Sequence, residues 1–162
     1  MTEHVEPLFS RPLLPIANAD DAELTCAAAF PHIAAAGGRA SVVHVIEKAG
    51  GAPDKAGVEQ REEVADELFD VARRAADDAG IDIHTDLRFA TDVGDAILDA
   101  AEDADATAIV FTPRGGRSWW DLFSGAVRDH LVRHSDRPVV VLPAADAADV
   151  DTDDADDAGG ET

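Results

Sequence analysis

Several features that would mark a function class are scarce or missing from the sequence. It has one cysteine, Cys26, so no disulfide can form within the chain. No apolar run approaches the roughly 20 residues that cross a bilayer, and the first residues lack the basic and then apolar layout of a signal peptide. We therefore expect a cytoplasmic protein that is not embedded in a membrane, with Cys26 as a small buried side chain in an alanine-rich helix.

Positive charge is also scarce. The chain has 13 Lys and Arg against 34 Asp and Glu, a formal net charge of −21. Because no basic face is available to neutralise phosphates, we do not expect a nucleic-acid partner. The acidic residues are spread along the whole chain, which favours adaptation to a halophilic cytoplasm over a specialised acidic partner-binding surface. At about 1 M salt the Debye length is only about 3 Å, so such a charge hardly repels itself.

Composition divides the 162 residues into three parts. Residues 1–11 show no period and are predicted to be a loose lead-in. Residues 12–143 are long enough for one domain with a real core. Residues 144–162 are of low complexity, with seven Asp, one Glu and no cation, and are predicted to be a disordered acidic tail, which solubilises the chain or, alternatively, binds a partner.

Within residues 12–143, strand and helix patterns alternate. Short apolar runs predict strands at 13–16, 40–46, 81–87, 108–111 and 139–142, with helices between them. Strict alternation in 81–87 indicates an edge strand, and this order of elements predicts an α/β fold with an open, doubly wound parallel sheet. Ligands of such sheets bind at the carboxyl ends of the strands. On the first two helices the residues expected to face inward are Leu24, Ala27, Ala28 and Ile33, then Val64, Leu68, Val71, Ala75 and Ala79.

The most informative stretch is residues 106–143, which is typical of a strand, a glycine-bearing loop, a helix and a strand. The start of such a helix presents free backbone N–H groups to an anion. Gly115 and Gly125 are separated by nine residues. This spacing resembles the nucleotide loop of the universal stress protein family, which has Gly, two residues, Gly, nine residues, then Gly followed by Ser or Thr. Here Thr112 occupies the first glycine place and Ala126 the hydroxyl place.

The resemblance covers roughly residues 12–143, including HVI at 44–46, AIL at 96–98 and RPVVVLP at 137–143. It implies a five-stranded parallel sheet of order 3-2-1-4-5 in an adenine-nucleotide alpha-hydrolase-like, Rossmann-type three-layer sandwich. It also implies that ATP or AMP binds at the strand tips. The site residues carried over in this way are Pro15, Ile16, Val45, Gly115, Gly125 and Val127. The loop itself adds Arg114 and Arg117, which are interpreted either as phosphate partners or as surface residues that form salt bridges.

The resemblance also implies a weakened site. Nucleotide-binding members end the first strand with an acidic residue, whereas Ala17 is aligned here. Thr112 adds a Cβ at the first glycine place, Pro113 removes a donor N–H, and Ala126 cannot bond a phosphate oxygen. Each lost bond to a charged oxygen is worth roughly 1.5–3 kcal/mol, so two losses weaken binding by about a hundredfold or more.

Two interpretations remain open. In one, the site still holds ATP, AMP or another anion through Arg114 and Arg117, with slow ATP hydrolysis or phosphoryl handling as the activity. In the other, which we favour, the nucleotide is weakly bound or lost and the protein is a regulatory module for a partner such as a transporter. The resemblance implies a homodimer through the last strand, where an apolar run lies at the sheet border: Val139, Val140, Val141 and Leu142.

No catalytic or metal centre is predicted. His130 and His134 are four residues apart on the last helix, a spacing that aligns two metal-binding nitrogens, but no third ligand is evident in the sequence. His44 is interpreted as a core or rim histidine because no titratable partner lies nearby. Since no paired base and nucleophile appears, we do not predict an enzyme.

Overall fold

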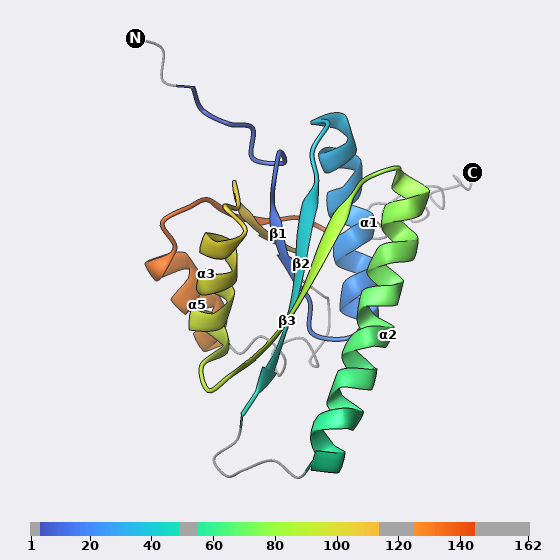
Figure 1. Cartoon of the computed structure of the whole chain (residues 1–162). Helices are drawn as coiled ribbons and strands as arrows, with labels where there is room; N and C mark the ends of the chain where they lie inside the picture. The colour runs from blue at the N-terminus through green and yellow to red at the C-terminus, as the bar shows by residue number, and fades with distance from the viewer. Residues whose placement is uncertain (1–3, 49–54, 114–124, 145–162) are drawn as a thin grey trace, which may run out of the picture.

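The computed structural model describes residues 4–48, 55–113 and 125–144 (Figure 1). Strands and helices alternate along the described chain, as the periodicity predicts. The elements are β1 (Leu13–Pro15), α1 (Ala19–Ala35), β2 (Ala40–Glu47), α2 (Lys55–Ala79), β3 (Ile83–Ala90), α3 (Val93–Asp103), β4 (Ile109–Phe111), α5 (Gly125–His134) and β5 (Val139–Val141). The predicted acidic tail and the loop that contains Gly115 lie outside the described residues.

The five strands form one parallel sheet in the order β3-β2-β1-β4-β5. This order and the predicted edge position of β3 are both confirmed. β2 and β3 pair along their full length, from Ala40 opposite Ile83 to Glu47 opposite Ala90. β5 pairs only with β4, through the register of Ile109 opposite Val139. The strand order changes direction between β1 and β4, which places the switch point of the sheet between these two strands.

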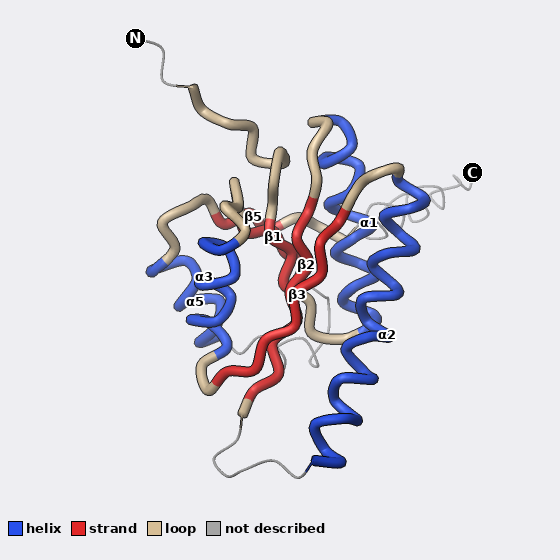
Figure 2. Tube along the Cα trace, in the orientation of Figure 1, coloured by secondary structure: helices blue, strands red, loops and turns tan. Residues whose placement is uncertain are grey.

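Helices cover both faces of the sheet (Figure 2). α1 and α2 pack against one face, where Leu14, Val42 and Val110 are buried. α3 and α5 pack against the other, where Leu13, Val43 and Ile109 are buried. The consecutive residues Val42 and Val43 therefore point to opposite faces and are both fully buried, which is why β2 reads as a continuous apolar run.

On α2 the predicted inward face is wrong by about one residue at its start. Val64 is 49% exposed, whereas its neighbour Ala65 is fully buried. The buried stripe is Ala65, Leu68, Phe69, Ala72 and Ala76, with Val71, Ala75 and Ala79 at its margin. Phe69 sets this orientation because burial of one aromatic ring outweighs that of one valine.

On α1 the predicted face is also partly wrong. Ile33 is buried as expected, but Ala27 is exposed and Leu24 and Ala28 are only half-buried. The buried face comprises Asp21, Ala22, Thr25, Cys26, Ala29, Phe30 and Ile33. Burial of Cys26 is thus confirmed. Two polar side chains belong to this face, so hydrophobicity alone does not locate it.

The segment before β1 contacts the domain at several points. The Phe9 ring stacks on His32 with centroids 4.9 Å apart. Backbone N–H of Arg39 donates to the carbonyl of Ser10 at 3.0 Å. Gly38 permits this approach, since a Cβ there would lie 2.3 Å from the Phe9 carbonyl oxygen. Among the described residues, no helix has the length and apolar character needed to cross a membrane.

Candidate functional site

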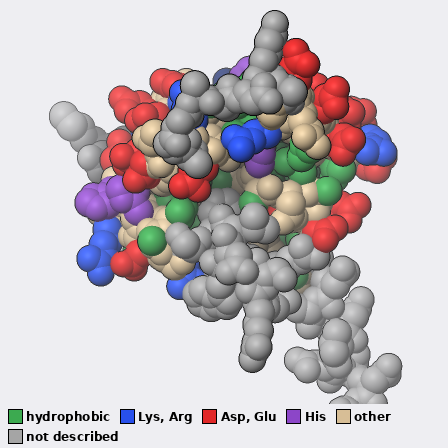
Figure 3. Space-filling view, turned by 90° about the horizontal axis from the view of Figure 1, so that it is seen from below, with side chains coloured by type: hydrophobic (Ala, Val, Ile, Leu, Met, Phe, Trp, Pro, Cys, Tyr) green, Lys and Arg blue, Asp and Glu red, His purple; other side chains and the backbone are tan. Residues whose placement is uncertain are grey.

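The carboxyl ends of the strands meet at one edge of the sheet, which is the lower end of the molecule in Figure 1. β1, β2 and β4 finish there, on either side of the switch point. Figure 3 views the molecule from this end: acidic side chains gather around the margin, and hydrophobic side chains appear nearer the centre. This edge is the place where a doubly wound sheet binds a ligand.

The end of β1 supplies Pro15 and Ile16, and both are buried. The Ile16 N–H donates to the Val43 carbonyl at 2.9 Å, and the Ile16 carbonyl lies 2.9 Å from Nδ1 of His44. That second contact fixes the half-buried imidazole against the end of β1, consistent with the rim position predicted for His44. Both Ile16 backbone groups are therefore engaged within the protein.

Immediately after β1, the chain turns into α1 through a set of local hydrogen bonds. Asn18 is the N-cap, and its side-chain oxygen accepts from the Asp21 N–H at 2.8 Å. The Asp21 carboxylate turns back to accept from the Ala17 N–H, also at 2.8 Å. Asp21 is only 6% exposed. The carboxylate at this turn thus lies in the protein interior and holds the turn together.

Val45 and Val127 are far apart in the sequence, but both lie on the same side of the sheet. Both are half-buried and pack against the core cluster between the sheet and α3 and α5. Gly125 is the first residue of α5, and a Cβ built on it would meet nothing within 4 Å. Three other predicted site residues, Arg114, Gly115 and Arg117, lie outside the described residues.

Thr112 follows the last residue of β4 and is only 1% exposed. Its hydroxyl oxygen is the one buried side-chain N or O atom of the described residues that has no hydrogen-bond partner. A buried hydroxyl without a partner costs about 1–3 kcal/mol. Pro113, which follows, is half-buried and has no N–H to donate. The tip of β4 therefore carries the unpaired Thr112 hydroxyl, and it lacks the backbone N–H that any residue other than proline would supply after Thr112.

A pocket of about 530 Å³ lies beside the end of β2, under the first turns of α2. Its apolar wall is Ile46 and Val64, and its polar residues include His44 and Arg61. Sequence reasoning missed this pocket because the apolar spacing of the helix predicts a core position for Val64. An exposed valine next to an arginine on the helix that follows β2 is the feature that marks it.

The sequence of residues 9–143 matches the family model described as "Universal stress protein family". No curated protein has significant sequence similarity to the chain. Among solved structures, one from the universal stress protein family of Burkholderia pseudomallei is 26% identical, with a TM-score of 0.64 over 85% of this chain and 98% of that one.

Two further similar structures were solved with nucleotides. The universal stress protein from Archaeoglobus fulgidus in complex with dAMP is 20% identical, with a TM-score of 0.60 over 84% of this chain and 99% of that one. A universal stress protein in complex with cAMP is 17% identical, with a TM-score of 0.63 over 81% of this chain and 94% of that one. With the family model spanning most of the sequence and the sheet order in agreement, the chain belongs to the universal stress protein family.

Proposed function

We propose that this protein is a cytoplasmic, dimeric regulatory module whose adenine-nucleotide site is weakened relative to nucleotide-binding members of its family. A nucleotide of the AMP type is the ligand class to consider, because similar structures hold dAMP and cAMP. The residues at the strand tips of this chain support the weakening, and they do so on both the adenine and the phosphate side.

On the adenine side, Ala17 offers no carboxylate at the end of β1. Asp21 is four residues further on, but its carboxylate accepts hydrogen bonds from the Ala17 N–H at 2.8 Å and from the Thr25 hydroxyl at 3.4 Å. A carboxylate that is 6% exposed and already engaged cannot substitute for one that projects from the strand end without breaking these bonds.

On the phosphate side, Thr112 carries the main argument. Its side chain is buried at the tip of β4, where binding members have a glycine that lets the chain turn tightly. Pro113 restricts Thr112 to the extended region and removes one N–H. Ala126, exposed in the first turn of α5, has no hydroxyl to donate to a phosphate oxygen. The phosphate site therefore lacks two hydrogen-bond donors, the N–H at Pro113 and a hydroxyl at Ala126, and it lacks a flexible backbone position at Thr112.

Dimerisation is proposed through β5. This strand lies at the edge of the sheet and pairs with one strand, β4. The side chains of Val139 and Val140, and that of Leu142 directly after the strand, are partly exposed. Val141 is 51% exposed. An exposed apolar edge strand is a ready template for pairing with a second copy.

The Ala126 position gives a sharp test because Thr and Val are nearly the same shape. Calorimetric titration with AMP and with ATP in about 1 M KCl should show weak binding by the wild-type protein. Ala126→Thr should tighten binding roughly tenfold or more by adding one bond to a charged oxygen, whereas Ala126→Val should not.

Tight wild-type binding that Ala126→Thr leaves unchanged would contradict the proposal, since the missing hydroxyl would then not limit affinity. An ATP turnover assay on the same samples addresses the competing enzyme function. Steady hydrolysis by the wild-type protein would favour a nucleotide-using enzyme over a regulatory module.

A further inference from the structure

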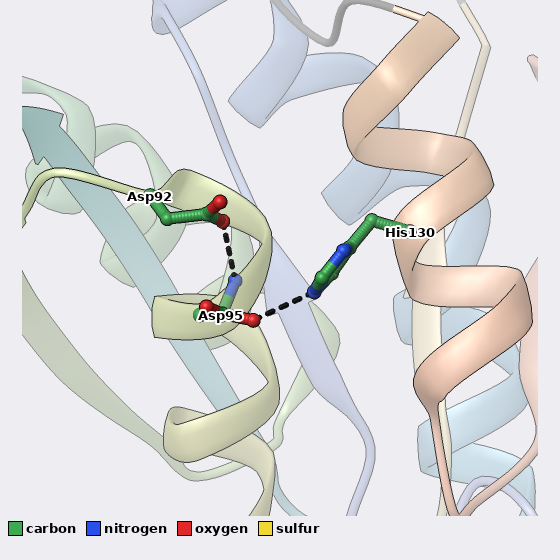
Figure 4. Close-up of side chains that lie close together, drawn as sticks. All are labelled: Asp92, Asp95 and His130. Atoms are coloured by element: carbon green, nitrogen blue, oxygen red, sulfur yellow. Dashed lines mark hydrogen bonds and ion pairs between the residues drawn. The ribbon is translucent and has the colours of Figure 1, made fainter.

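A histidine from α5 and two aspartates from the start of α3 lie close together (Figure 4). Nε2 of His130 lies 2.7 Å from Oδ1 of Asp95. One side-chain ligand atom from each of Asp92, Asp95 and His130 can be chosen so that all three lie within 4.8 Å of one another. The three residues come from two helices that pack against each other on one face of the sheet.

Local structure explains how these side chains come to be held together. Asp92 is the N-cap of α3, and its Oδ1 accepts from the Asp95 N–H at 2.9 Å. Gly94 lies against the imidazole: a Cβ at this position would be 2.8 Å from Cδ2 of His130. The lack of a side chain at Gly94 is therefore what lets the His130 ring reach the first turn of α3.

The geometry points to a binding site for a first-row divalent metal ion of the Zn²⁺ class at Asp92, Asp95 and His130. Imidazole nitrogen with carboxylate oxygens is a donor set that suits Zn²⁺, whereas Mg²⁺ and Ca²⁺ favour oxygen ligands alone. Zn–N and Zn–O bonds of about 2.0–2.2 Å place tetrahedral ligands about 3.3 Å apart. The present separations, 2.7 Å between Nε2 of His130 and Oδ1 of Asp95 and at most 4.8 Å among all three ligand atoms, bracket that value.

The ligand atoms are accessible and have coordination capacity to spare. The Asp95 side chain is 64% exposed and that of His130 is 30% exposed. The cap uses Oδ1 of Asp92 and leaves Oδ2 for another partner. Three protein ligands leave a fourth tetrahedral position for water.

The surroundings contain more acidic than basic side chains. A pocket of about 680 Å³ adjoins the two aspartates and is lined in addition by Asp86 and Asp99, with Lys48 and Arg88 as its cations. The centroid of the His134 ring lies 4.6 Å from that of the His130 ring, but His134 is not one of the three proposed ligands. The competing arrangement is a metal-free hydrogen bond or ion pair between His130 and Asp95, and experiment separates the two.

The test is calorimetric titration of the full chain with Zn²⁺ in about 1 M KCl, where weak attraction to the many surface carboxylates is screened. We expect one Zn²⁺ per chain. His130→Gln keeps an N–H that can donate to Asp95, yet it removes the imidazole ligand, and Asp95→Asn removes the carboxylate. Each should weaken Zn²⁺ binding tenfold or more. His134→Gln is the matched control on the same helix and should retain binding.

A second readout guards against loss of folding. Zn²⁺ should raise the melting temperature of the wild-type protein and of His134→Gln, but not that of His130→Gln or Asp95→Asn, because the ion binds only the native arrangement. Absence of Zn²⁺ binding would overturn the inference, as would binding that survives both His130→Gln and Asp95→Asn. Binding that depends on His130 and His134 but not on Asp95 would also overturn it, by assigning the ion to the histidine pair alone. The inference stands independently of the proposed nucleotide function.

Discussion

The carboxylate of Asp21 accepts a hydrogen bond from the backbone N–H of Ala17 at 2.8 Å. This contact closes the turn between β1 and α1 at the strand tip. The carboxylate here is directed into the protein, and it joins the Thr25 hydroxyl in the buried face of α1. The acidic side chain nearest the end of β1 in this turn is thus engaged in holding the turn together.

Removal of this carboxylate should therefore be costly. Asp21→Ala leaves the Ala17 N–H without its acceptor and should lower the free energy of unfolding by about 1–3 kcal/mol. Asp21→Asn should cost less, because an amide oxygen still accepts. Denaturant unfolding measures both. Glu23→Ala, at an exposed position of the same helix, should change stability by no more than about 0.5 kcal/mol. Equal losses in Asp21→Ala and Glu23→Ala would contradict the role of the buried contact.

The substitution Thr112→Val should raise the free energy of unfolding, whereas Asp21→Ala should lower it. Valine has the shape of threonine without the hydroxyl, so the substitution removes the unpaired buried oxygen and should raise the free energy of unfolding by about 1 kcal/mol or more. Thermal unfolding of the two proteins at equal salt measures the difference. A destabilised Thr112→Val protein would show that the hydroxyl has a partner in solution.

Cys26 should be chemically inert in the folded protein. Burial, with a smaller contribution from the charge of Asp21, raises the pKa of its thiol to about 12 from an ordinary value of 9.0. Thiol reagents at pH 8 should label the native protein very slowly and the unfolded protein rapidly. Because the folded pKa is the higher one, the thiol's contribution to stability is complete below pH 9 and is lost as pH rises toward 12. Rapid native labelling would contradict this burial.

A charge on β5 should separate the proposed dimer. Val141→Lys places an ammonium group on the exposed side of the edge strand, where strand pairing would bury it. Sedimentation equilibrium in about 1 M KCl should give dimer mass for the wild-type protein and monomer mass for Val141→Lys. Val132→Lys, at a 62% exposed valine of α5, should remain dimeric. A wild-type protein of monomer mass would remove the proposed interface.

The sheet could be predicted because strand and helix periods alternate clearly along the chain. Val42 and Val43 show why: continuous burial of neighbouring residues indicates a strand covered on both sides. The inward faces of the helices were harder to predict. α1 contains the run Ala27-Ala28-Ala29, whose members are alike in the sequence but differ in burial. Its buried face also includes Asp21 and Thr25, which are joined by a hydrogen bond that a hydrophobicity pattern does not reveal.

The cluster of Asp92, Asp95 and His130 could not be predicted for a different reason. His130 could be assigned to a helix from the spacing of its apolar neighbours, but its partner lies 35 residues earlier in the chain. Their meeting depends on how α3 packs against α5, and on the absence of a side chain at Gly94. Such a contact is a property of tertiary packing, and no local pattern specifies it.

The nucleotide content of the purified protein tests the central claim most directly. Protein prepared without added ligand is denatured, and the released small molecules are measured by ultraviolet absorbance and mass spectrometry. A weakened site predicts far less than one adenine nucleotide per chain after purification. About one ATP or AMP per chain would contradict the account, because a ligand retained through purification requires the contacts that Ala17, Thr112 and Ala126 do not provide.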